Sequence, residues 1–69
     1  MVEVFKTNVQ EPAQAAALLS ALLQCMSLLR VTFDLEDCDR VLRVEGAQVC
    51  ARSIIEQLTV RGFYCQVLE

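Results

Sequence analysis

The 69-residue chain has no histidine, only two glycines and no serine in a nucleophile-elbow motif. Without histidine there is no Cys–His pair for nucleophilic catalysis, and Gly46 and Gly62 are too far apart to form a phosphate-binding loop. These absences remove the common arrangements of hydrolases and nucleotide-binding enzymes. We therefore predict no catalytic residue, no bound cofactor and no enzymatic activity.

The chain also lacks a cluster of positive charge. Its net charge is −3, and its six basic residues are dispersed among nine acidic ones. Nucleic-acid binding relies on grouped lysine and arginine side chains that neutralise phosphates. We therefore predict that no nucleic acid is a partner.

None of the four cysteines forms a close C-x-x-C pair; they are Cys25, Cys38, Cys50 and Cys65. The sequence begins directly with a strand-like run, so we expect no secretory signal peptide. We predict reduced cysteines that act as small core hydrophobes in a cytoplasmic protein. Among them, we expect Cys38 to be the most exposed, because acidic residues surround it.

The longest uncharged segment extends from Pro12 to Leu29. A membrane-spanning helix needs about 20 predominantly apolar residues, whereas polar side chains interrupt this segment, which runs into an alternating, strand-like pattern at Val31. We predict a buried helix followed by a strand, and no membrane insertion.

Hydrophobic periodicity predicts one domain, residues 1–69, with the order β-α-β-β-α-β. Strands are expected over residues 2–6, 29–35, 40–45 and 63–68, and helices over residues 12 to 25 or 26 and 47–61. This order predicts an α+β, ferredoxin-like two-layer sandwich, in which two helices cover one face of a four-stranded antiparallel sheet. The inward side of the first strand is open, because Val2 and Val4 compete with Phe5.

The first helix has an unusual outward side. Its predicted core side contains Ala15, Leu18, Leu19, Leu22, Leu23 and Met26, and its opposite arc contains Ala13, Gln14, Ala17, Ser20, Ala21 and Gln24. Exposed helix faces normally carry charge, and this arc carries none. The arc is either a contact surface, or its composition reflects only the high helix propensity of alanine and has no further role. The uncovered sheet face, expected to hold Thr32, Val41, Arg43 and Tyr64, is a second candidate contact surface.

The second helix has a more ordinary pattern. Its predicted apolar stripe consists of Ala47, Cys50, Ala51, Ile54, Ile55 and Leu58, and Gly62 is placed to end it.

Two segments resemble the heavy-metal-associated domain family of metallochaperones and P-type ATPase modules. Residues 31–35 with 41–44 resemble the central hairpin of that family, and residues 54–63 resemble its second helix closing on glycine and an aromatic residue. The resemblance implies a ferredoxin-like fold. The family's two metal-binding cysteines fall on Glu11 and Gln14 here, so no ligand for Cu(I) or Zn(II) carries over. The resemblance therefore implies no metal residue in this chain.

Two groups of side chains carry oxygen atoms that could bind a hard metal ion, but neither has the pattern of a metal site. Glu11 with Gln14 is better interpreted as a helix cap and a solvated amide, because a hard cation needs about six or more oxygens. The second group is Asp34, Glu36, Asp37 and Asp39, which lacks the glycine and terminal glutamate of a calcium loop and is interpreted as a hairpin turn.

Together these patterns predict a non-catalytic interaction module that forms a homodimer or binds an unidentified protein. The alternative is copper or zinc handling by non-standard ligands, such as Cys25 or Cys38 shared between two subunits. A small-molecule sensor that uses the sheet face has no dedicated residues to support it.

Overall fold

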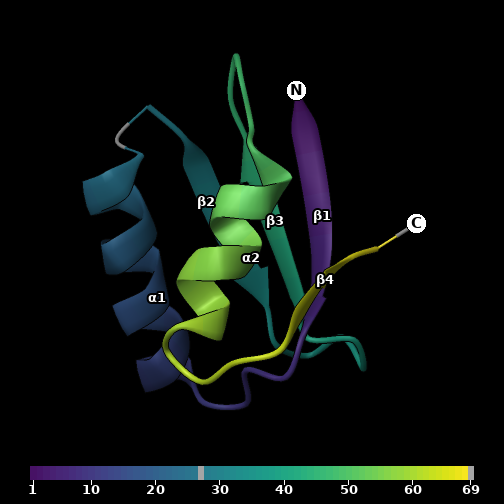
Figure 1. The fold of residues 1–69 in the computed structure, drawn as a ribbon. Helices are drawn as coiled ribbons and strands as arrows, with labels where there is room; N and C mark the ends of the chain where they lie inside the picture. Colours follow the sequence, from purple (N-terminus) through teal and green to yellow (C-terminus); the bar gives the residue numbers. More distant parts are fainter. Residues whose placement is uncertain (27, 69) are drawn as a thin grey trace.

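The computed structural model describes residues 1–26 and 28–68 as a four-stranded antiparallel sheet with two helices on one face (Figure 1). The elements are β1 (Val2–Thr7), α1 (Pro12–Cys25), β2 (Arg30–Asp34), β3 (Val41–Glu45), α2 (Ala51–Thr59) and β4 (Cys65–Val67). The strand order is β2-β3-β1-β4, so β1 and β3 are central. This confirms the predicted α+β ferredoxin-like sandwich.

The register of the central strands decides which side of β1 faces the helices. Phe5 is paired with Leu42 on β3 and with Val67 on β4. Both Phe5 and Leu42 are fully buried, whereas Val2 is half exposed. Because directly paired residues point to the same face, Phe5 belongs to the core and Val2 and Val4 to the open face.

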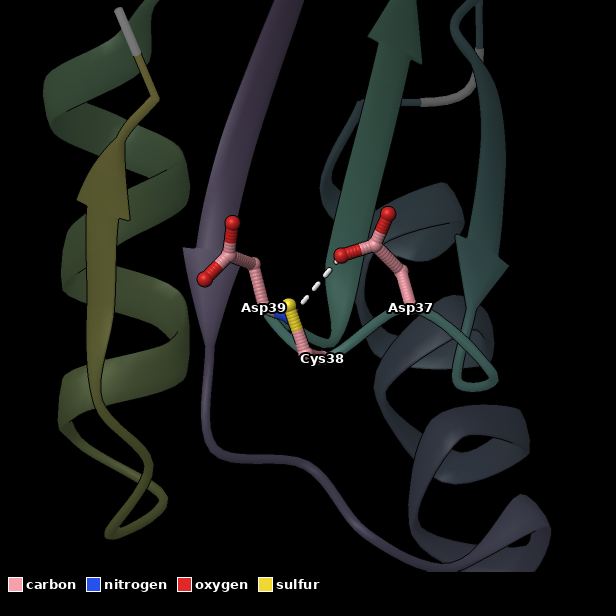
Figure 2. Close-up of side chains that lie close together, drawn as sticks. All are labelled: Asp37, Cys38 and Asp39. Carbon is pink, nitrogen blue, oxygen red and sulfur yellow. Dashed lines mark hydrogen bonds between the residues drawn. The ribbon is translucent and has the colours of Figure 1, made fainter.

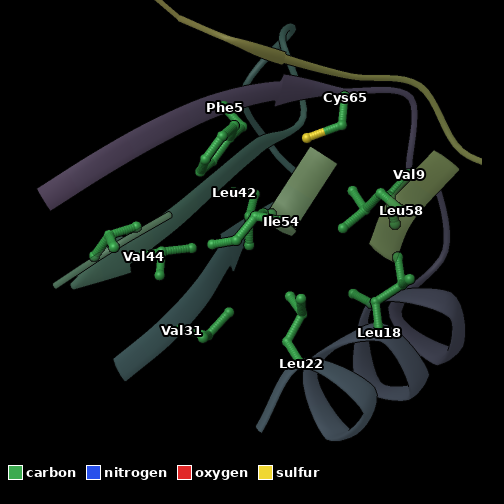
Figure 3. Packing of buried hydrophobic residues seen from close by; sticks show 12 residues of the cluster. Phe5, Val9, Leu18, Leu22, Val31, Leu42, Val44, Ile54, Leu58 and Cys65 are labelled. Atoms are coloured by element: carbon green, nitrogen blue, oxygen red, sulfur yellow. The ribbon is translucent and has the colours of Figure 1, made fainter. Parts of the chain in front are cut away.

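The core lies between the sheet and the two helices (Figure 3). Its fully buried large side chains are Phe5, Val9, Leu18, Leu22, Leu42, Val44, Ile54 and Leu58. Each helix supplies a pair of them at i and i+4, which is the spacing that places two side chains on one face. Val9 comes from the loop before α1, so this loop is anchored by its own apolar side chain.

The second helix is shorter than the sequence predicted. It begins at Ala51 rather than at Ala47, and Cys50 is the extended N-cap with φ −96° and ψ 100°. The reason lies at the end of β3, where Gly46 continues the ladder by exchanging two backbone hydrogen bonds with Met1 at 3.0 and 2.8 Å. The chain therefore needs residues 47–49 to reach the helix layer. The predictions that Ala47 and Cys50 face the core are wrong, since both are exposed.

The end of α2 follows the glycine signal. The helix ends at Thr59 and passes through a turn to Gly62, which has φ +88°. This left-handed conformation favours glycine. The Phe63 amide then donates to the Leu58 carbonyl at 3.0 Å, which closes the helix end.

The last strand is also shorter than predicted and spans three residues. Before it, the Tyr64 amide donates to the Asn8 side-chain oxygen at 2.8 Å. This side-chain bond replaces a ladder bond, so regular pairing begins only at Cys65 opposite Thr7. In the described part of the chain, no helix is long and apolar enough to cross a membrane.

Candidate functional site

The outer face of α1 is the most unusual surface of the molecule. The exposed side chains of this helix between Ala13 and Gln24 form an uncharged set: Ala13, Ala16, Ala17, Ser20, Leu23 and Gln24. We call these six residues the outer face of α1. Leu23, predicted to lie in the core, keeps 36% of its surface exposed and is the largest apolar side chain in the set. The face therefore combines small residues with one exposed leucine and no charge.

Two residues of the predicted arc lie partly inside the structure. Gln14 and Ala21 are half-buried and share one flank of the helix. Ala16 and Leu23 lie about 160° away around the helix axis, on the opposite flank. The crossover from β1 through α1 to β2 is right-handed (Figure 1). With Leu18 and Leu22 facing the sheet, this handedness turns the Gln14 flank toward α2 and the Leu23 flank past β2. The prediction that Gln14 and Ala21 belong to the exposed arc is wrong, since both are half-buried.

Gln14 acts within the chain as a helix cap. Its side-chain oxygen accepts hydrogen bonds from the backbone amides of Gln10 and Glu11, each at 3.3 Å. Glu11 is the extended N-cap, and Pro12 occupies the first helical position. The arrangement satisfies N–H groups that the start of a helix leaves unpaired. The amide predicted to be solvated is thus a structural group.

The open face of the sheet carries an ion pair within the chain. Arg43 lies between Thr32 on β2 and Val4 on β1, and its Nε lies 3.1 Å from a carboxylate oxygen of Glu45. Val41, near one end of the face, is half-buried.

Tyr64 is also on the open face, at the β4 side. It is 48% exposed, and its hydroxyl donates to the side-chain oxygen of Gln66. The predicted residues Thr32, Val41, Arg43 and Tyr64 therefore share this face. Its exposed apolar side chains include Val2 on β1 and Leu68 after β4.

The β2–β3 turn brings three possible metal-ligand side chains together. One ligand atom each from Asp37, Cys38 and Asp39 lies within 4.8 Å of the others (Figure 2). However, Asp37 Oδ1 accepts the Asp39 amide at 2.8 Å, and an oxygen of Asp39 lies 3.6 Å from the Lys6 ammonium. The two carboxylates thus shape and charge-balance the turn, as the sequence indicated for this hairpin.

The cysteines differ from the prediction at two positions, Cys25 and Cys50. Cys65 is buried, while Cys25, Cys38 and Cys50 are exposed, and all four are free thiols. The three exposed cysteines lie at element boundaries, where the core pattern no longer determines burial. Cys38 is exposed as predicted. Burial raises the pKa of the Cys65 thiol to about 11.

Cys50 has an environment that the sequence analysis missed. The Ser53 hydroxyl donates to its Sγ at 3.3 Å, and this hydrogen bond is the main reason why its pKa lies below the ordinary value of 9.0. The backbone amide of Ser53 and the charge of Arg52 act in the same direction. The signal in the sequence is a cysteine directly before a helix, with serine three residues later.

Cys50 also borders an open hollow of about 560 Å³ between the end of α1 and the start of α2. The residues that line it are mainly apolar: Met26, Leu28, Leu29, Ala47, Gln48, Cys50 and Ser53. Leu28 stands 94% exposed at its rim. Among the described residues, no charged side chain lines the hollow, so it has little to orient a polar ligand.

Comparison of this chain with protein-family models, with curated proteins and with solved structures returns no match. The functional argument therefore depends on the geometry of these surfaces.

Proposed function

We propose that this chain is a non-catalytic association module with a fold like that of heavy-metal-associated domains, and that it docks through the outer face of α1. The observation that carries the proposal is this face: a helix of 14 residues without one charged side chain, with Leu23 exposed at its flank. Small uncharged side chains allow a neighbouring backbone to approach closely and require no desolvation of charge.

The loop before α1 supports a docking role over metal delivery. It presents Val9, Glu11 and Gln14 where the resembled family has a methionine and two cysteines. Val9 is fully buried, and Gln14 caps the helix. These side chains stabilise the start of α1, which positions the outer face, and none of them is a soft ligand.

The proposal includes a cytoplasmic location. Three free thiols lie on the surface, at Cys25, Cys38 and Cys50. Exposed free thiols fit a reducing compartment, because oxidising compartments convert them into disulfides.

The test is site-specific photo-cross-linking in the cells that make the protein. A benzophenone amino acid at Ala16, in the outer face of α1, should yield a covalent protein adduct. The control position is Thr59, which is exposed at the end of α2. An adduct at Ala16 that is absent at Thr59 is the expected result. Equal labelling at both positions, or none at Ala16, would contradict the proposal.

The second candidate function is the handling of copper or zinc by non-standard ligands. It is favoured by the Asp37–Cys38–Asp39 cluster, in which Cys38 is exposed and free. Titration with Zn(II) or Cu(I) against a competing chelator tests it. Binding that disappears in a folded Cys38→Ser variant would establish this candidate, and binding that persists when all four cysteines are replaced would exclude a thiolate site.

A further inference from the structure

We propose that a second copy of this chain binds at the β2 edge of the sheet, through antiparallel pairing of β2 with its symmetry mate centred on Thr32. The outer faces of the two α1 helices then meet above the paired strands. This inference rests on the proposed function, because it names the partner against which α1 packs. The result is an eight-stranded sheet with four helices on one side.

The β2 edge has little to prevent such pairing. β2 ends the sheet and keeps an unbroken register with β3 from Arg30 to Asp34. Natural edge strands are usually protected by charged side chains, especially lysine, or by proline, bulges or very short length. The opposite edge, β4, has only three residues, whereas the five residues of β2 include no lysine or proline and carry charge only at the two ends, Arg30 and Asp34. β2 is therefore the edge that can accept another strand.

In an antiparallel sheet, the backbone N–H and C=O groups of successive residues point alternately to the two neighbouring strands. This alternation identifies the backbone groups of β2 that do not bond to β3. Met1 and Gly46 exchange two backbone hydrogen bonds, so the alternate residues of β3 that include Val44 bond to β1. The remaining residues of β3, including Arg43, then bond to β2 at Thr32. By the same alternation, the backbone groups of Val31 and Phe33 point away from β3.

A pairing centred on Thr32 uses these outward groups. It places Val31 opposite Phe33 of the second copy, on the helix side of the sheet. The symmetry axis creates two such pairs, Val31 with Phe33 of the second copy and Phe33 with Val31 of the second copy. Each pair exchanges two backbone hydrogen bonds, so four form in total. Thr32 lies opposite its own copy on the open face, where threonine pairs are favourable in sheets.

Charge selects this register over its neighbours. Arg30 and Asp34 are both exposed and lie at opposite ends of β2 on the same face. Antiparallel pairing about Thr32 sets each Arg30 opposite Asp34 of the other copy and forms two ion pairs. A shift of two residues in one direction sets Thr32 opposite Arg30, and in the other direction opposite Asp34. Either shift removes both Arg30–Asp34 pairs. In the second shift Arg30 would face Glu36, which lies beyond the end of β2.

The same symmetry axis explains the composition of α1. The right-handed crossover directs Ala16, Ser20 and Leu23 past the β2 edge, toward the second copy. Two helices that lie above adjacent central strands must approach closely, and small residues permit this. Lysine or glutamate in this flank would be forced out of water between the helices.

The test exchanges the charges of the β2 edge. Arg30→Asp alone sets two acidic pairs across the interface, and Asp34→Arg alone sets two basic pairs. Each single variant should raise the dimer dissociation constant by about tenfold or more. An equimolar mixture of the two should form a heterodimer, because every contact across the interface is then attractive. The double variant should regain self-association.

Sedimentation velocity measures all four samples, and urea unfolding at low concentration checks that each is folded. This check is needed because Arg30→Asp places a carboxylate opposite Glu45 of its own chain. Single variants that associate as well as the unmodified chain would overturn the inference, as would a mixture no more associated than its components. An unmodified chain that stays monomeric at millimolar concentration would also overturn it.

The outcomes separate this inference from the proposed function. If the Ala16 cross-link forms but the charge exchanges have no effect, β2 is not the docking edge and the association role stands. If the Ala16 cross-link is absent, the association role itself fails.

Discussion

The two helices cover the same face of the sheet, yet their outward sides have opposite characters. α2 is amphipathic, with Ile54 and Leu58 buried and Arg52 and Glu56 exposed. α1 buries a similar pair, Leu18 and Leu22, but presents only uncharged groups to the outside. Each helix buries two large aliphatic side chains in the core. The core therefore does not explain why the outward side of α2 carries charge and that of α1 does not.

An outward helix face normally has contact with water alone, and α2 fits this case. The outer face of α1 lies beside the free β2 edge, where a second layer of protein can cover it. Under the proposed function, the outward side of α2 is in contact with water and the outer face of α1 is in contact with protein.

The largest expected effect concerns what the helices share. Leu22→Ala in α1 and Leu58→Ala in α2 should each lower the free energy of unfolding by about 2–5 kcal/mol, because each removes a fully buried side chain. Urea denaturation of the two variants measures this at a concentration where the chain is monomeric. If only the α2 variant lost stability, α1 would be packed loosely against the core. The two helices could then not be compared as equal contributors to the core.

The next effect separates the outward sides. Ala16→Lys and Thr59→Lys add the same charge to an exposed position of α1 and of α2. We expect the α1 variant to weaken association by about tenfold, or about 1.4 kcal/mol, since the lysine loses water at the contact. The α2 variant should associate as the unmodified chain does. Sedimentation velocity distinguishes them, and equal weakening would remove the special role of α1.

A smaller effect compares two glutamines. Gln14→Ala removes the amide that accepts two backbone N–H groups at the start of α1, and should cost about 0.5–1.5 kcal/mol of stability. Gln57→Ala removes an exposed contact to the Arg61 side chain in α2, and should cost only about 0.2–0.5 kcal/mol. Thermal unfolding of both variants checks the order. The reverse order would show that Gln14 does not cap the helix.

The smallest effect at neutral pH is chemical and compares the start of α2 with β4. Cys50 should be alkylated by iodoacetamide at a lower pH than an ordinary thiol, because Ser53 lowers its pKa. Cys65 should react only when the chain unfolds, since it is buried and its pKa is raised to about 11. Mass spectrometry of peptides after timed alkylation measures both rates.

Cys65 also predicts how stability changes at high pH. Its folded pKa of about 11 exceeds the ordinary value of 9.0, so its contribution is complete below pH 9 and is lost as the pH rises toward 11. A Cys65→Ala variant should lack this component of the decline. Urea unfolding of both chains between pH 9 and 11 measures the free energy of unfolding at each pH. If it fell equally in the two chains, Cys65 would not cause this part of the decline.

The fold was predictable from sequence because its determinants are local and periodic. Alternation along Val41–Glu45 and the paired leucines of α1 predict the layers correctly. The start of α2 was not predictable, because residues 47–49 follow the backbone pairing of Gly46 with Met1, a contact between distant parts of the chain. The exposure of Cys25 and Cys50 was missed because these residues lie at the ends of helices, where hydrophobic character no longer determines burial.

The candidate surface was predictable only in part. The lack of charge along α1 is visible in the sequence, but helical periodicity alone assigns Leu23 to the core and Gln14 to the solvent. The position of α2 beside one flank, and of the free β2 edge beside the other, reverses both assignments. Which side of a helix is available for contact depends on its neighbours in the sheet layer, and those are set by chain crossover.

The most direct measurement of the central claim is disulfide trapping at Thr32. In a chain whose Cys25, Cys38 and Cys50 are replaced by serine, Thr32→Cys places two thiols opposite each other in the proposed pairing. Residues at such a position lie about 4.5 Å apart between Cα atoms, within the range of a disulfide. Mild oxidation should give a covalent dimer from Thr32→Cys and none from Gln66→Cys at the other edge. A Thr32→Cys chain that stays monomeric under oxidation would contradict the claim that β2 joins two copies.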